Sequence, residues 1–201
     1  MLNINNKNMK KLLFMAVMAI VAMTASAQIE KGLRFGITVS GSMSKYSEIH
    51  GAKNTFGYGG GLTVEYSFNP NVYLGTGLQF GLRGTKLDAL EVSGQTISVD
   101  GSLKSYNIVL PVNIGGRINV SDNFSIFGQV GPYVSFAAKK AELQTVETVT
   151  GEAFDWGFNA KVGVEIRNQF QIFGGYELGM KEVWPNDAKN RSIVFGLAYM
   201  F

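Results

Sequence analysis

Residues 154–167 alternate between apolar and polar side chains along their whole length. The apolar positions are Phe154, Trp156, Phe158, Ala160, Val162, Val164 and Ile166, and every position between them is polar, charged or glycine. Successive side chains of a β-strand point to opposite faces, so the pattern predicts a strand with one apolar and one polar face. Such a strand is long enough to cross a bilayer, which takes about 9–11 tilted residues.

Seven further segments repeat this alternation, which predicts eight strands. They cover residues 33–43, 56–68, 72–82, 103–118, 124–137, 170–181 and 191–201. Long polar connections are predicted at 44–54, 85–101, 138–152 and 182–190, and short turns at 69–71, 120–123 and 168–169. Because bacterial outer-membrane barrels alternate short periplasmic turns with longer extracellular loops, we expect an all-β fold, an eight-stranded antiparallel up-and-down transmembrane β-barrel.

Alternation alone also fits a soluble lipocalin-like carrier, whose apolar face lines a ligand cavity. Three features favour the membrane barrel. The predicted polar faces are rich in glycine, which suits a narrow interior. Aromatic residues gather at both ends of the apolar faces, as they do at the two membrane–water interfaces. Charged residues are only 16% of the chain, which is few for a polar face in contact with water.

A few residues do not fit the pattern. Strict alternation places Phe127, Tyr133 and Phe173 on the polar face, and Pro111 and Pro132 lie within strands, where proline removes a ladder hydrogen bond. A β-bulge shifts the alternation of a strand by one residue. We therefore expect at least one bulge near the two prolines.

The first 27 residues have the order of a secretory signal peptide. Lys7, Lys10 and Lys11 precede an apolar run over 12–23, and small residues follow at 25–27. We expect residues 1–27 to be cleaved and the barrel domain to comprise residues 28–201, located in the cell outer membrane after export. Removing these three lysines from the 18 basic residues leaves 15 against 15 acidic ones, so the charge gives no reason to expect a nucleic-acid partner.

Seven charged residues on the predicted polar faces form the candidate site. We expect a structural ion-pair network in the lumen made of Arg34, Glu65, Arg117, Glu165, Arg167, Lys161 and Glu177. Buried charges must be paired or hydrated. A gated narrow pore is the alternative, but an eight-stranded interior is just wide enough for side chains to fill, which favours a closed plug.

The sequence predicts no catalytic, cofactor or metal site. His50 is the one histidine and lies beside Ser47 and Glu48 in a predicted long connection. Ser–His hydrolysis needs a scaffold that fixes the nucleophile against its base, and one polar loop does not provide it. There is no cysteine, which excludes a disulfide framework and a thiol nucleophile.

Two stretches carry a family resemblance. Residues 106–112, Tyr-Asn-Ile-Val-Leu-Pro-Val, and residues 195–201, Phe-Gly-Leu-Ala-Tyr-Met-Phe, resemble the PorT-like outer membrane protein beta-barrel domain family, among the small barrels of the OmpA/OmpX type. The resemblance implies that Leu197, Tyr199 and Phe201 form the terminal signal that the barrel assembly machinery recognises. It also implies a barrel subunit of a secretion apparatus as one role.

We expect a non-enzymatic integral outer-membrane protein that contacts outer-membrane lipid, either as a structural component or as a surface-binding protein acting through four extracellular loops. An extracellular or secretion-system protein is the expected protein partner. The alternative is a narrow channel or a transport subunit, and a lipid-modifying enzyme is a third interpretation.

Overall fold

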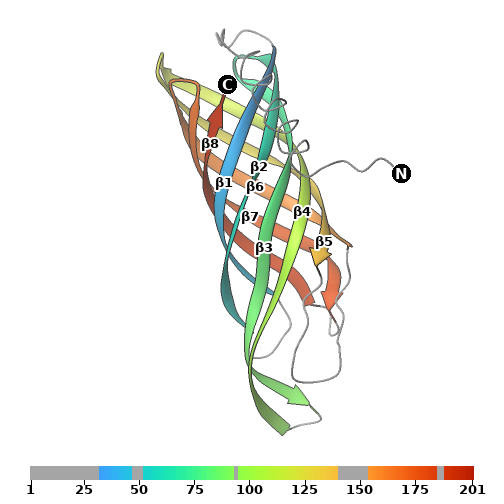
Figure 1. The fold of residues 1–201 in the computed structure, drawn as a ribbon. Helices are drawn as coiled ribbons and strands as arrows, with labels where there is room; N and C mark the ends of the chain where they lie inside the picture. Colours follow the sequence, from blue (N-terminus) through green and yellow to red (C-terminus); the bar gives the residue numbers. More distant parts are fainter. Residues whose placement is uncertain (1–31, 47–51, 93–94, 140–153, 185–187) are drawn as a thin grey trace, which may run out of the picture.

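The computed structural model describes residues 32–46, 52–92, 95–139, 154–184 and 188–201, which form one closed barrel of antiparallel strands (Figure 1). The strands are β1 (Gly32–Tyr46), β2 (Ala52–Asn69), β3 (Val72–Val92), β4 (Gln95–Ser121), β5 (Phe124–Lys139), β6 (Phe154–Ile166), β7 (Phe170–Trp184) and β8 (Ala188–Met200). Each strand pairs with the next one, and β8 pairs with β1. The predicted fold class is confirmed. Within the described part of the chain, no helix is both long and apolar enough to span a membrane.

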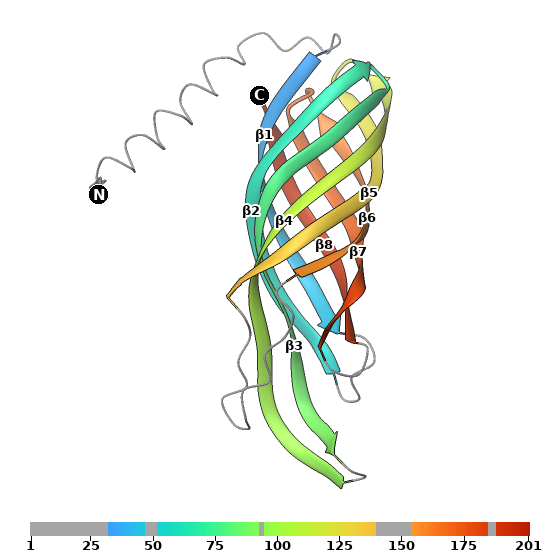
Figure 2. The same cartoon turned by 90° about the vertical axis from the view of Figure 1, so that its right-hand side faces the viewer.

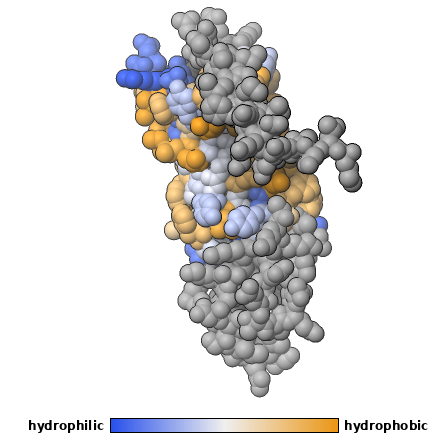
Figure 3. Space-filling view, in the orientation of Figure 1, coloured by the Kyte–Doolittle hydropathy of each residue, from blue (hydrophilic) through white to orange (hydrophobic). Residues whose placement is uncertain are grey.

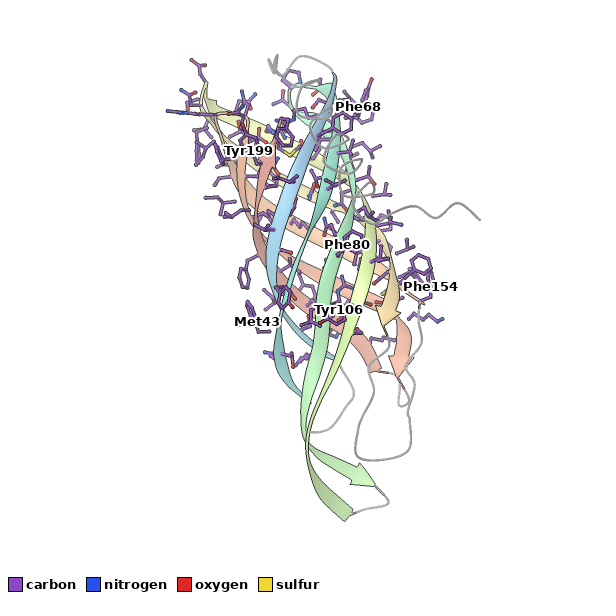
Figure 4. The ribbon with its side chains drawn as sticks, viewed as in Figure 1. Met43, Phe68, Phe80, Tyr106, Phe154 and Tyr199 are labelled. Carbon is purple, nitrogen blue, oxygen red and sulfur yellow. The ribbon has the colours of Figure 1, made fainter. Side chains whose placement is uncertain are left out.

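The apolar faces of the strands lie on the outside of the barrel. Val162 is 68% exposed, whereas Asn159 on the opposite face of the same strand is 2% exposed. Figure 4 shows Met43 and Phe154 pointing away from the barrel, and Figure 3 shows hydrophobic residues on its visible wall. A soluble barrel would hold these apolar faces inside, since contiguous exposed apolar surface is rare on soluble proteins. The lipocalin-like alternative is therefore wrong.

One end of the barrel carries the short connections and the C-terminus (Figures 1 and 2). We call it the turn end, and the opposite end the loop end. The β6–β7 turn comprises residues 167–169, one more than predicted, and Gln169 N donates to Ile166 O at 3.1 Å. Arg167 and Asn168 have φ angles of 53° and 58°, which is the left-handed conformation that tight hairpin turns require.

At the loop end the strands run further than predicted. The predicted connection 85–101 is wrong, because β3 and β4 stay paired as a hairpin up to Val92 and Gln95. Figures 1 and 2 show this hairpin projecting beyond the rest of the barrel. The predicted connection 182–190 is also largely paired, through β7 and β8. The apolar residues of the β3–β4 hairpin, such as Leu87, Leu90 and Ile97, do not form one unbroken alternation, so the segment reads as a connection in sequence.

The expected bulge near the prolines is also wrong. Pro111 pairs with Tyr133 and Ile114 with Val130 in one register, and the register shifts lie at the two ends of the β4–β5 pairing, at Tyr106/Asn107 and Asn119/Ser121. Tyr133 and two phenylalanines remain inside the barrel, at most 8% exposed. Each inward aromatic residue has a glycine as cross-strand partner, which leaves room for its ring. These pairs are Tyr73–Gly115, Phe127–Gly163, Tyr133–Gly157 and Phe173–Gly196.

Candidate functional site: the lumen

Two arginines, two glutamates and a glutamine meet in the lumen near the turn end, and we call them the turn-end cluster. Its members are Arg34 (β1), Glu65 (β2), Arg117 (β4), Glu165 (β6) and Gln171 (β7). Arg34 forms an ion pair with Glu65, and its Nη2 lies 3.1 Å from Glu165 Oε2. Arg117 Nη2 lies 2.9 Å from Glu65 Oε2 and 3.2 Å from Glu165 Oε2. Gln171 Nε2 donates to both carboxylates, at 3.0 and 2.7 Å.

The turn-end cluster is buried and carries no formal net charge, since its two guanidinium groups balance its two carboxylates. Glu165 is fully buried, and the four other members are at most 6% exposed. Arg34 Nη1 also donates to the carbonyl oxygen of Asn168 in the β6–β7 turn, at 3.0 Å. The Arg117 guanidinium lies over the Tyr73 ring, 4.8 Å from its centroid. The cluster therefore ties five strands together across the lumen with paired charges.

A second group of polar residues fills the lumen toward the loop end, and we call it the loop-end cluster. It comprises Arg83 (β3), Tyr133 and Ser135 (β5), Asp155 (β6) and Glu177 (β7). Arg83 forms an ion pair with Glu177 and lies 5.3 Å from the centroid of the Tyr133 ring. The Tyr133 hydroxyl donates to Asp155 Oδ2 at 3.3 Å. This cluster spans half the strands, so charge and aromatic side chains obstruct the lumen at a second level.

The space between the clusters is partly apolar. Phe127, Phe173, Val194 and Ala198 form a buried apolar group. Lys161 has its ammonium 5.4 Å from the centroid of the Phe173 ring. A cavity of about 30 Å³ borders Lys161, Gln129 and Gln171. This volume holds roughly two water molecules.

The structure places six of the seven predicted lumen residues inside the barrel, in three groups. Arg34, Glu65, Arg117 and Glu165 meet in the turn-end cluster, and Glu177 belongs to the loop-end cluster. Lys161 lies between the clusters, bordering the cavity. The prediction for Arg167 is wrong, because this residue lies exposed in the β6–β7 turn rather than in the lumen.

Several residues of the two clusters were not in the predicted network. Gln171 and Asp155 alternate in phase with the inward charges of their strands, so strand parity identifies them as lumen residues. Tyr73 and Tyr133 also follow that parity. The contacts of their rings with the guanidinium groups of Arg117 and Arg83 join different strands, and a single sequence does not reveal such contacts.

A family model described as outer membrane protein beta-barrel domain matches residues 12–201. The chain belongs to this family. With its apolar exterior, it is an integral barrel of the outer membrane. No curated protein matches the chain.

Solved structures agree with this assignment at the level of the fold. OprG of Pseudomonas aeruginosa is 13% identical, with a TM-score of 0.54, and the match covers 86% of this chain and 97% of that one. Neisserial surface protein A is 12% identical, with a TM-score of 0.53 and coverages of 85% and 100%.

The C-terminal residues of this outer-membrane barrel form an aromatic row at the turn end. Leu197 is 54% exposed on the outer face. The Tyr199 ring lies 4.9 Å from the Phe170 ring and 5.1 Å from the Phe201 ring, centroid to centroid. Phe201 N donates to Phe35 O at 2.7 Å, so the last residue extends the pairing of β8 with β1. Recognition of this row by the assembly machinery remains a prediction.

Ser47, Glu48 and His50 lie outside the described residues, as do residues 1–31 with the predicted signal peptide. In the rest of the chain that the structure describes, no group of His, Cys, Asp and Glu side chains is arranged to hold a metal ion.

Proposed function

We propose that this barrel is a non-enzymatic protein of the outer membrane with a sealed lumen, which acts through its loop end at the cell surface. The observation that carries the proposal is the turn-end cluster. Arg34 and Arg117 each contact both Glu65 and Glu165 across the lumen, and Gln171 also donates to Glu65 Oε1. Ion pairs this buried leave no continuous water path, and breaking them is costly. A plug of this kind supports a structural or surface-binding role.

The projecting β3–β4 hairpin supports the surface-binding role. The pairing between β3 and β4 continues to the pairs Leu90–Ile97 and Val92–Gln95. It extends beyond the residues at which β3 pairs with β2 and β4 pairs with β5. Outer-membrane barrels expose their longer connections outside the cell, so we assign the loop end to that side. The partner class that fits is an extracellular protein or, as the PorT-like resemblance suggests, a component of a secretion system.

Planar-bilayer recording tests the sealed lumen. We expect no stable conductance steps from the purified wild-type barrel. An open channel would conduct ions, and the Glu65→Ala variant would then change its conductance or ion selectivity. Asp122→Asn is the control, since Asp122 lies exposed in the β4–β5 turn. Stable steps from the wild type would refute the sealed lumen.

A narrow channel is the second candidate, because the lumen holds two cavities of about 30 Å³ each, and Gln79 lines both. The second cavity also borders Arg83 and Glu177 of the loop-end cluster. In this alternative, movement of the Arg83–Glu177 pair joins the cavities into a path. The conductance experiment separates the two roles.

Antibody labelling of intact cells tests the orientation. An epitope inserted between Val92 and Gln95, at the tip of the hairpin, should be labelled without permeabilisation. The control is the same epitope in the Asp122–Asn123 turn, which should be labelled only after the outer membrane is opened. The opposite result would place the loop end in the periplasm and remove the basis for a surface role.

A further inference from the structure

The outward face of the barrel is almost free of charge. Among outward-facing strand residues whose side chains the structure describes, the charged ones are Lys45, Lys189 and Arg191. All three are basic and lie at the loop end: Lys45 and Arg191 pair across the seam between β1 and β8, whereas Lys189 lies opposite Glu182 of β7. Two like charges paired across one seam, on a face that carries few charges among the described side chains, indicate a specific local environment.

Cross-strand register places two of these cations side by side. Lys45 is the direct partner of Arg191, and the preceding pair, Ser44 and Ser192, points into the barrel. The serine hydroxyls hydrogen-bond there at 2.8 Å, which fixes Lys45 and Arg191 on the outer face. Like charges directly opposite each other on a sheet are destabilising. Neither residue forms an ion pair with a carboxylate of the described residues, so an external anion would relieve the repulsion.

Lys45 and Arg191 end a column of lipid-facing apolar residues. The next outward pair along the seam toward the turn end is Met43 and Ile193, which are 48% and 54% exposed. Beyond it lies Phe195, whose ring centroid is 6.2 Å from that of Phe56. Met43 marks this level of the barrel in Figure 4. Basic residues bordering an apolar belt lie at the depth of lipid headgroups, and their aliphatic stems extend along the apolar surface.

We propose that Lys45 and Arg191 bind the phosphate group of an outer-leaflet lipid, with its acyl chains on the apolar column below. A guanidinium binds phosphate oxygens bidentately, and an ammonium supplies a further charge-assisted hydrogen bond. Lipid phosphate is favoured over free phosphate because the apolar column adjoins the cations. This site rests on the outward orientation of the loop end proposed above and not on the sealed lumen, so lipid binding and conductance fail independently.

The test measures binding of bis-phosphorylated lipid A to the purified barrel in detergent by native mass spectrometry. The Lys45→Gln/Arg191→Gln variant should bind more weakly, by about fivefold for each cation removed. Arg167→Gln is the matched control, because it removes an exposed cation at the turn end and should bind as the wild type does. Dephosphorylated lipid A should bind equally weakly to all three proteins.

A charge reversal separates lipid binding from folding. Lys45→Glu creates an opposite-charge pair with Arg191, so the barrel should stay folded while its affinity for phosphorylated lipid A falls at least as far as in the double variant. Equal affinity in the wild type and both seam variants would overturn the proposal. An equal loss in Arg167→Gln would overturn it as well, and so would full competition by millimolar inorganic phosphate.

Discussion

Replacing Glu165 by glutamine tests whether the lumen is a dry plug. Glu165 Oε2 accepts from Arg34 at 3.1 Å, from Arg117 at 3.2 Å and from Gln171 at 2.7 Å. Glutamine keeps the size of the side chain but removes its charge. Two buried guanidinium groups then share Glu65 alone, and the formal charge of the turn-end cluster rises from zero to one.

The expected cost follows from this imbalance. Removing one partner of a buried ion pair costs about 3–5 kcal/mol, because the remaining charge stays buried without compensation. Exposed pairs contribute only about 0–1 kcal/mol, because water screens them. Since Glu165 is fully buried, we expect the higher range for Glu165→Gln. A water-filled channel would instead give the lower range.

Urea titration of the barrel folded into lipid vesicles measures this cost. Fluorescence of Trp156, which is 42% exposed on the outer face, reports transfer between lipid and water. Asp122→Asn is the control and should change the free energy of unfolding by less than about 0.5 kcal/mol. Adding Arg117→Met to Glu165→Gln restores neutrality and should recover part of the loss, with a coupling of about 0.5–3 kcal/mol. Two results together would refute a dry plug. Glu165→Gln would lower the free energy of unfolding by less than about 1 kcal/mol, and the double variant would lose the sum of the two single-variant losses.

Three further predictions use the same unfolding assay. Val162→Arg should cost about 2–4 kcal/mol, because it places a cation against lipid near mid-membrane, and an unchanged free energy would contradict the assigned exterior. Asn159→Leu should cost about 1–3 kcal/mol, because Asn159 Nδ2 donates to Asn113 Oδ1 at 2.9 Å and to Gly131 O at 3.0 Å; no loss would mean that water replaces both bonds. Phe201→Ala should lower the yield of folded barrel in reconstituted assembly. Its free energy of unfolding, measured after refolding from urea, should fall by only about 1 kcal/mol, as expected for the loss of one aromatic contact. An unchanged yield would exclude Phe201 from the assembly signal.

Strand alternation predicts which side chains face lipid, and the reason is physical. The two faces of a barrel strand contact different environments, so the side-chain period of two is written directly into the sequence. It separates Val162 from Asn159 correctly, and it places Arg34 and Glu65 in the lumen although they lie on different strands. Short turns are recognisable for a similar local reason, since their residue types favour turns.

Alternation does not predict how the lumen is filled. Phe127 and Tyr133 contradict a purely polar interior, and they fit only because Gly163 and Gly157 lie directly across from them. Such pairs depend on the register between strands, which one sequence does not provide. The prediction that Arg167 lies in the lumen failed for a local reason. Arg167 is the last residue of the apparent alternation, but the left-handed turn already begins there.

The two locations of charge in this barrel obey one rule. Inside, where water is scarce, the guanidinium groups of Arg34 and Arg117 lie against the carboxylates of Glu65 and Glu165, because an uncompensated charge there is too costly. Outside, the hydrocarbon-facing strands avoid charge until the loop end of the β1–β8 seam. Lys45 and Arg191, which form no ion pair with a carboxylate of the described residues, are tolerable at that depth because headgroup anions can supply the opposite charge. A chain that balances its buried charges so closely would not leave Lys45 beside Arg191 at the edge of the lipid unless that position met anions.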